Sequence, residues 1–380
     1  MPELPEVETV ARDLRPRLVG ATVVGARTSW ARTLRTHDPA TFATAVAGRT
    51  VKAVGRRAKL VVVELTGDAA LTIHLKMTGQ LFVVAAAAPL DPYVRLVLEL
   101  DDGRELRFRD IRKFGRVGLY PRDPASGELV VELGGAAVFA GLGPEPLDPA
   151  FTLRAFRARL RGRRGRLKPL LLDQGFVAGI GNIYADEALW AARLHPLRSS
   201  AGLRPADERR LYEAIQTILA EAIERRGSSI DDYTAPDGDG EMQERLNVYQ
   251  RTGEPCPRCR RPIRRIVIGA RATHFCSWCQ RLPAGDRAGA RKILATGDRS
   301  AGGRATTASA PGSGSAATPS RGRRWTELAA EGTLGLTPAE AIRAAQRARS
   351  DRTRRAAAGR RAAARSAMGP GSTPDETAPR

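Results

Sequence analysis

The hydrophobic positions along the chain change their period near residue 22. Residues 3–18 place Val7, Val10 and Leu14 three or four positions apart, which predicts a helix with acidic residues in its first turn. From about 22 to 121 the apolar residues instead form short runs, rich in valine and leucine and separated by Gly and Asp turns. The runs that predict strands lie at 22–24, 60–65, 71–75, 94–100 and 106–108. Repeated short strands at this spacing favour a β-sandwich or a barrel.

The pattern changes again after residue 121. Residues 122–150 are rich in Gly, Pro and Ala and read as a linker, whereas 151–160 and 207–226 have helical spacing, the second stopped by Gly227. Beyond 285 the chain consists largely of Ala, Arg, Gly, Ser and Thr, a composition typical of disorder. We therefore expect an α+β multidomain fold with an N-terminal helix and β-sandwich at 2–125, a linker at 126–150, a helical domain with a polar loop at 151–245, a cysteine module at 246–283 and a basic low-complexity tail at 284–380.

The charge of the chain points to a polyanionic partner. The formal net charge is +21, and residues 286–380 contribute 18 basic and 8 acidic residues, or +10, which leaves +11 for the preceding part. Nucleic acid is the commonest polyanion and an anionic membrane surface is the rival. No apolar run reaches the roughly 18–20 residues of a membrane span, and the acidic N-terminus differs from a signal peptide. We therefore expect a bacterial-type cytosolic or nucleoid protein without a membrane partner.

The tail allows two interpretations. It either tethers the protein to DNA without sequence preference, which would speed the search for a target, or it is a solvated extension of little function. A capping box with proline at the first helical position, Thr337-Pro338-Ala339-Glu340, predicts one helix at about 338–365.

The four cysteines form two pairs with two-residue gaps. Cys256 and Cys259 are separated from Cys276 and Cys279 by 16 residues, and two such pairs supply the four thiolates of a tetrahedral zinc site. Four cysteine ligands leave no open coordination position, so one structural Zn²⁺ is expected, with a pair of redox dithiols as the alternative. The residues between the pairs predict a β-hairpin with a basic tip, suited to holding an arginine against a phosphate.

The N-terminus offers a nucleophile. Pro2 is small enough for the initiator Met1 to be removed, which would expose a secondary amine. An α-amino group has a pKa of about 8, so an appreciable fraction is neutral near pH 7 and can attack an electrophilic sugar carbon to give an iminium ion. Taken alone, a proline at this position is also compatible with a simple helix start.

Several blocks, in the same order, resemble the formamidopyrimidine-DNA glycosylase family and extend over residues 2 to about 283. They are Pro2-Glu3-Leu4-Pro5-Glu6-Val7-Glu8-Thr9, Gly55-Arg56-Arg57-Ala58-Lys59, His74-Leu75-Lys76-Met77-Thr78-Gly79, Arg109-Asp110-Ile111-Arg112-Lys113-Phe114-Gly115, Lys168-Pro169-Leu170-Leu171-Leu172-Asp173, Gly179-Ile180-Gly181-Asn182-Ile183-Tyr184-Ala185, Leu246-Asn247-Val248-Tyr249 and the cysteine module. The resemblance implies a helix-two-turn-helix in the helical domain. It also implies a bifunctional glycosylase and abasic-site lyase that removes oxidised purines, such as 8-oxoguanine and formamidopyrimidines, from double-stranded DNA by β,δ-elimination, acting as a monomer.

The resemblance also implies roles for individual residues. Pro2 would form the Schiff base, Glu3 would move protons during opening of the sugar ring, and Glu6 would fix the N-terminal turn. Lys59 would assist elimination near the phosphate or sugar, and Arg271 at the hairpin tip would hold the phosphate of the flipped nucleotide.

A second set of residues would bind DNA. Met77, Arg112 and Phe114 would fill the gap left by a nucleotide flipped out of the duplex. The residues expected near phosphates are His74, Arg164, Lys168 and Asn182, and the loop 228–244 would cover the extruded base. His37, His195 and His274 are expected to be structural or surface residues.

Three departures from the family pattern bear on substrate preference. Leu90-Asp91-Pro92-Tyr93 replaces a histidine-containing segment, the loop lacks an aromatic residue near Glu241-Met242, and Lys113 stands where arginine is common. Two alternatives stay open. One is an enzyme of the endonuclease VIII type, which prefers oxidised pyrimidines, and the other is a non-catalytic zinc protein that binds damaged DNA.

Overall fold

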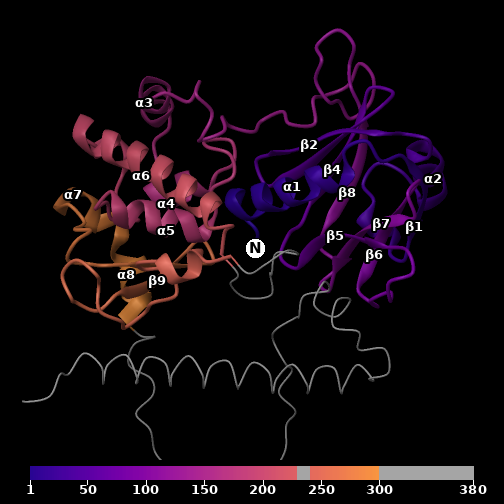
Figure 1. Ribbon diagram of the computed structural model, residues 1–380. Helices are drawn as coiled ribbons and strands as arrows, with labels where there is room; N and C mark the ends of the chain where they lie inside the picture. Colours follow the sequence, from indigo (N-terminus) through magenta and orange to yellow (C-terminus); the bar gives the residue numbers. More distant parts are fainter. Residues whose placement is uncertain (229–239, 299–380) are drawn as a thin grey trace, which may run out of the picture. The chain divides into compact units, whose positions relative to one another are not determined.

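The computed structural model describes residues 1–228 and 240–298, and the helix expected at 338–365 lies outside this part of the chain. The N-terminal part contains helix α1 (Leu4–Leu18), helix α2 (Pro39–Val46) and two four-stranded antiparallel sheets (Figure 1). The first sheet has the order β1 (Val23–Thr28), β6 (Val94–Leu100), β7 (Arg104–Asp110) and β5 (Gly79–Ala85). The second has the order β2 (Val51–Arg57), β3 (Leu60–Leu65), β4 (Ala69–His74) and β8 (Arg116–Pro121).

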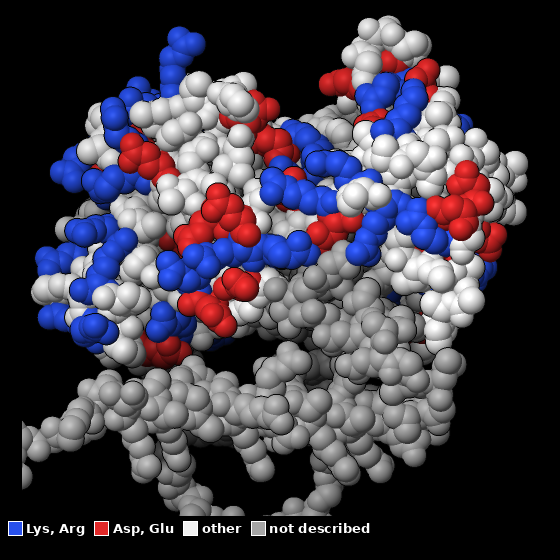
Figure 2. Space-filling view, in the orientation of Figure 1, with Lys and Arg blue, Asp and Glu red and all other residues white. Residues whose placement is uncertain are grey.

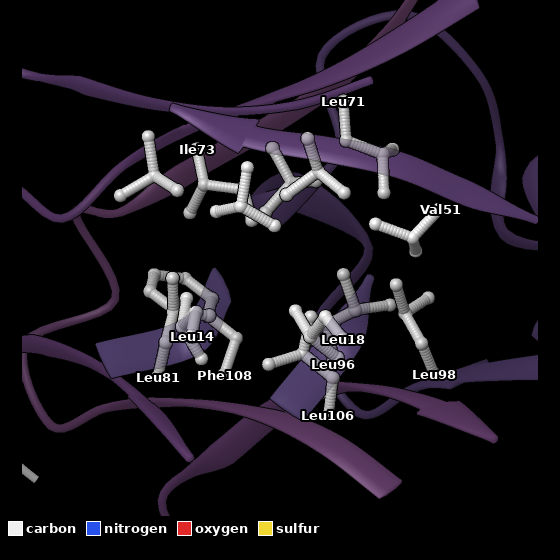
Figure 3. Close-up of a cluster of buried hydrophobic side chains, with 14 of the residues drawn as sticks. Leu14, Leu18, Val51, Leu71, Ile73, Leu81, Leu96, Leu98, Leu106 and Phe108 are labelled. Atoms are coloured by element: carbon white, nitrogen blue, oxygen red, sulfur yellow. The ribbon is translucent and has the colours of Figure 1, made fainter. Parts of the chain in front are cut away.

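The core lies between the two sheets, which confirms the β-sandwich. Leu71 and Ile73 of β4 face Leu96 and Phe108 of the other sheet, and Leu14 of α1 lies among them (Figure 3). These side chains are at most 3% exposed. Full burial of one such side chain contributes roughly 1.5–3 kcal/mol to stability. Because Leu14 and Leu18 of α1 are buried in the same cluster, this burial holds α1 against the sheets.

Strands β2, β5 and β8 and helix α2 had no counterpart among the expected elements. Strand β2 buries only Val51 and Val54, and arginines and a glycine interrupt its apolar pattern. Helix α2 does carry a local signal, because the carboxylate of Asp38 accepts hydrogen bonds from the N–H groups of Ala40 and Thr41 at its start.

The helical domain consists of α3 (Leu153–Gly162), α4 (Leu167–Leu172), α5 (Asn182–Ala191) and α6 (Pro205–Glu224). The face of α6 that carries Leu211, Ile215 and Leu219 is buried against α5, as its spacing predicts. Gly227 follows with a φ of +73°, a left-handed conformation that suits glycine and ends the helix. The described strands and helices confirm the expected α+β class.

The cysteine module contains the expected hairpin of β9 (Arg264–Ile268) and β10 (Arg271–Phe275). Ordered structure continues beyond the boundary expected at 283, with α7 (Ala284–Arg287) and α8 (Arg291–Asp298). Ala290 is buried, and Ile293 and Leu294 pack against the hairpin core, so the apolar residues of this basic segment belong to the module. In the described residues, none of the helices combines the length and apolar character that a bilayer crossing requires.

Candidate active site and nucleic-acid interface

The carboxylate of Glu3 joins the first residues of the chain to the start of α5. Its Oε2 atom accepts hydrogen bonds from the N–H groups of Gly181 at 2.7 Å and Tyr184 at 3.4 Å, and Oε1 accepts one from Ile183 at 2.8 Å. These amides belong to the first turn of a helix, where backbone N–H groups lack intrahelical acceptors. Burial raises the pKa of Glu3, and the charge of Lys59 opposes that shift.

Glu6 fixes the same turn, as expected. One oxygen accepts the N–H of Glu3 at 2.8 Å, and the other accepts the hydroxyl of Tyr184 at 2.5 Å and the N–H of Ser228 at 2.8 Å. Glu6 is 2% exposed, so its charge is matched by donors from three segments. Pro2, which precedes these two acids, is itself buried.

Two glycines allow this close approach. A Cβ atom at Gly181 would lie 2.3 Å from the side chain of Glu3, and one at Gly179 would lie 2.6 Å from Leu4. The N–H of Leu4 donates to the carbonyl of Gly179 at 3.0 Å. Next to Gly181, the buried Oδ1 atom of Asn182 has no hydrogen-bond partner among the residues that the structure describes.

Lys59 and Arg271 act electrostatically on the same group of residues. Lys59 is 7% exposed in the turn between β2 and β3. Burial lowers the pKa of Lys59, against the charges of Glu3 and Glu6, and Arg271 adds to the lowering. Arg271 is exposed beside a two-residue turn, Gly269 and Ala270, whose positive φ angles of +52° and +61° fit the tight hairpin. A depressed pKa favours the neutral amine needed for proton transfer.

Lys168, expected at a phosphate, is fully buried. Its Nζ atom donates to Asp186 at 2.6 Å and to the carbonyl of Ala272 at 3.1 Å. The other oxygen of Asp186 accepts the N–H of His274 at 2.9 Å and contacts the Nδ1 atom of its ring at 3.2 Å. This pair therefore links α4, α5 and β10. The phosphate contact of Lys168 stays a prediction, and it requires the ammonium group to leave this pair.

Asp186 and Glu187 were not among the expected site residues. Glu187 is 1% exposed and accepts the N–H groups of Asn247, Val248 and Tyr249 at 2.8–2.9 Å, so it fixes the segment that leads to the cysteine module. The signal that would have found them is two consecutive acids on the apolar helix that begins at Asn182.

His74 lies at a cavity of about 380 Å³ lined also by Arg35, Lys76 and Arg116. Burial, with a contribution from Lys76, lowers the pKa of His74 to about 3, so the ring is neutral near pH 7. Its Nδ1 atom accepts the N–H of Lys76 at 3.1 Å. The ring proton is therefore on Nε2, which can donate to a phosphate at this basic cavity.

The three residues expected to fill the gap in the DNA lie on two neighbouring turns. Met77 is 36% exposed in the turn between β4 and β5, and Phe114 is 47% exposed in the turn between β7 and β8. The guanidinium group of Arg112 lies 5.0 Å from the ring centre of Phe114. We call these two turns, residues 75–79 and 110–115, the wedge loops. Exposed apolar side chains beside an arginine suit insertion into a base stack.

Other expected residues lie outside this cluster. Arg164 is exposed in the segment between α3 and α4. In the segment 90–93, which differs from the family pattern, the carboxylate of Asp91 pairs with Arg109 at 2.8 Å, and Arg109 lies over the ring of Tyr93. Met242 is buried in the helical core, while the loop residues 229–239 lie outside the described part. On the face shown in Figure 2, Lys and Arg side chains are spread over the described residues, with acidic groups among them.

The four cysteines converge as a zinc site requires. Their sulfur atoms all lie within 4.8 Å of one another, with 4.0 Å between Cys256 and Cys279 and 3.4 Å between Cys259 and Cys276. Sulfurs around a tetrahedral ion with Zn–S bonds of about 2.3 Å lie about 3.8 Å apart. The cluster fits one structural zinc ion, and the distances between the sulfurs exclude disulfides in this structure.

Sequence profiles of known domains match three parts of the chain. Residues 1–117 match the formamidopyrimidine-DNA glycosylase N-terminal domain and residues 142–234 match the H2TH domain of the same enzyme. Residues 253–282 match a zinc finger found in FPG and IleRS. The order of the three matches is the order of the sandwich, the helical domain and the cysteine module.

Whole proteins are similar over the same range. The formamidopyrimidine-DNA glycosylases of Herpetosiphon aurantiacus and Chloroflexus aurantiacus are 49% and 50% identical over 282 residues, 74% of this chain and 100% and 98% of theirs. Among solved structures, a Lactococcus lactis enzyme bound to Fapy-dG-containing DNA is 36% identical, with a TM-score of 0.67, covering 74% of this chain and 100% of that one. The MutM (Fpg) protein of Thermus thermophilus is 40% identical with a TM-score of 0.65 and the same coverage.

Proposed function

The chain belongs to the formamidopyrimidine-DNA glycosylase family and is a base-excision repair DNA glycosylase with abasic-site lyase activity, and we propose that Pro2 is its nucleophile. We further propose that oxidised purines are its substrates. The observation that carries the assignment is the position of Glu3. It follows Pro2 directly, is fixed by the amides of α5, and shares its electrostatic surroundings with Lys59. These contacts support the assignment of acid, base and nucleophile to neighbouring residues.

The proposed reaction begins after Met1 has been removed. The Pro2 amine attacks C1′ of the damaged nucleotide, and the base leaves with the bonding electron pair and takes up the proton that the amine loses. Glu3 then protonates the ring oxygen as the bond between C1′ and that oxygen breaks, a role favoured by its raised pKa, and the opened sugar is held as an iminium ion between C1′ and Pro2. Lys59 accepts a proton during elimination, and Arg271 holds the phosphate that departs. Hydrolysis of the iminium ion then releases the enzyme.

DNA binding would use two sets of side chains. Met77, Arg112 and Phe114 would replace the extruded nucleotide in the stack, while His74 and Asn182 would donate hydrogen bonds to phosphates. Zinc would keep the hairpin rigid so that Arg271 stays at its tip. Support for double-stranded DNA as partner comes from the Lactococcus lactis structures, which contain Fapy-dG DNA or DNA with an abasic site. A monomeric protein of the bacterial cytosol or nucleoid is expected.

Lesion preference is tested by single-turnover release from matched duplexes. One set carries 8-oxoguanine or formamidopyrimidine opposite cytosine, and the other carries an oxidised pyrimidine opposite its normal partner. We expect purine lesions to be released faster by at least roughly tenfold, or about 1.4 kcal/mol in activation free energy. Faster release of oxidised pyrimidines would instead favour the endonuclease VIII type. Tight binding without release would favour a non-catalytic protein.

A further inference from the structure

The two wedge loops leave the same edge of one sheet. Gly79 and Asp110 are register partners in the ladder between β5 and β7, and Met77 and Arg112 each lie two residues beyond them. Lys76 and Lys113 have positive φ angles of +56° and +59°, so both loops contain a residue in the left-handed region that side chains disfavour. Loops of this conformation require fixed hydrogen bonds to keep one geometry.

A buried carboxylate and a buried hydroxyl supply those hydrogen bonds. Asp110 and Thr78 are each 1% exposed. The Thr78 hydroxyl donates to one oxygen of Asp110, and the other oxygen accepts the N–H of Gly115 at 2.7 Å. The same hydroxyl accepts the N–H of Arg112 at 3.1 Å. A single pair of side chains therefore ties the Met77 loop to both ends of the loop that carries Arg112 and Phe114.

Two further contacts hold this arrangement. The guanidinium of Arg95 donates to the carbonyl of Asp110 at 2.9 Å, which fixes the backbone where the second loop begins. On the solvent side, the ammonium of Lys113 lies 4.3 Å from the ring centre of Trp30, at the position where this chain departs from the family pattern. The loop is thus held from the protein interior by Asp110 and from outside by Trp30.

We propose that Thr78 and Asp110, assisted by Trp30, are positioning residues that hold the wedge loops in the geometry of insertion and so set discrimination between the bases opposite the lesion. The inference rests on the proposed function, in which Arg112 meets the orphaned base. Insertion must offset the unstacking of the duplex, and a loop ordered beforehand loses little conformational freedom at that step. Arg112 can select a partner base only if its backbone is fixed, and the Thr78 hydroxyl fixes it.

Thr78→Val is the direct test, because valine has the shape of threonine without the hydroxyl. Thr78→Ser keeps the hydroxyl, and Thr50→Val removes a part-buried hydroxyl that bonds to Thr22, away from both wedge loops and from Trp30. For each variant, single-turnover release of 8-oxoguanine opposite cytosine and opposite adenine is compared with cleavage of a preformed abasic site. 2-Aminopurine opposite the lesion reports unstacking of the orphaned base. An abasic site lacks the damaged base and makes smaller demands on flipping.

We expect Thr78→Val to slow release of 8-oxoguanine by roughly tenfold and to reduce the preference between opposite bases, with the 2-aminopurine signal reduced. Cleavage of the abasic site should change less than about twofold, and Thr78→Ser and Thr50→Val should match wild type. Trp30→Leu, at a half-buried position, should lower the opposite-base preference in the same direction.

Equal losses on both substrates, or equal losses in Thr78→Val and Thr78→Ser, would overturn the proposal, because they would indicate a general packing defect. Unchanged discrimination in Thr78→Val and Trp30→Leu would overturn it as well. Failure of the underlying function is distinguishable. If Met77→Ala with Phe114→Ala leaves the 2-aminopurine signal of wild type unchanged, the wedge assignment itself is wrong. If the Met77→Ala and Phe114→Ala double variant abolishes the signal while Thr78→Val does not alter it, only the positioning role of Thr78 and Asp110 is wrong.

Discussion

At the scale of single residues, Glu3 shows how burial changes the acidity of a common side chain. Its carboxylate meets the amide of Gly181, 178 positions away in the chain, and two further amides of the same helix turn. These donors favour the charged form, whereas burial favours the neutral form and raises the pKa overall. An acid poised in this way can give up and regain a proton nearer to neutral pH than an exposed glutamate.

His195 makes stability depend on pH. The ring is 4% exposed, its Nδ1 atom accepts the N–H of Leu197 at 3.0 Å, and it packs edge-on against Phe275. Burial lowers the pKa of His195 to about 4, whereas the unfolded chain binds this proton near pH 6.5. Unfolding therefore takes up a proton between these values, and the free energy of unfolding falls as pH decreases through that window.

We expect this histidine to contribute up to about 3 kcal/mol to the loss of stability between pH 6.5 and 4. His195→Asn keeps an acceptor for Leu197 but removes the titration, so its stability should fall less steeply over that range. Urea unfolding of both proteins at several pH values measures this difference. The titration of the carboxylates contributes equally to both proteins and cancels in the comparison. Parallel curves for the two proteins would contradict the assignment.

At the scale of elements, α5 connects the candidate active site to the cysteine module. Asn182 begins the helix beside Glu3, and one turn later Asp186 pairs with Lys168 and with β10. Burial lowers the pKa of Lys168, and the charge of Asp186 opposes that shift. Because β10 begins with Arg271, the position of the hairpin tip depends on a buried ion pair.

Lys168→Met should destabilise the protein by about 3–5 kcal/mol, because it leaves the Asp186 carboxylate buried without its cation. Adding Asp186→Asn removes that charge and should recover much of the loss. Lys52→Met, at an exposed position of β2, should change stability by less than about 0.5 kcal/mol. Urea unfolding of the zinc-loaded proteins supplies the values. A double variant less stable than Lys168→Met would show that the cost does not arise from an unpaired charge.

The elements and the site differ in how far the amino-acid pattern predicts them. Strands β3 and β6 follow from continuous runs such as Leu60–Leu65, whereas arginine and glycine interrupt the apolar residues of β2 and β8 and weaken their signal. Resemblance to a family identified Glu3 and Lys59 but not what each contacts. The pairing of Lys168 with Asp186 depends on the packing of three elements, which local periodicity does not encode.

At the scale of the whole molecule, basic charge and zinc serve a protein that acts on DNA. The net charge of +21 is shared between the tail and the preceding residues, so both parts would attract a duplex. Helix α8, which runs to Asp298, packs on β9, and removal of everything after 285 would also remove part of the hairpin core. A test of the tail as a DNA tether therefore needs a chain that ends after α8.

We attribute the chemistry of this enzyme to its N-terminal proline. Borohydride trapping on a duplex with one 8-oxoguanine tests this assignment, with wild type compared with Pro2→Gly and the mass of each N-terminus measured. We expect wild type lacking Met1 to form a covalent protein–DNA adduct and the variant to lose it. Absence of the adduct in wild type, with Met1 removed and tight binding retained, would contradict the claim and favour a protein that recognises damage without repairing it.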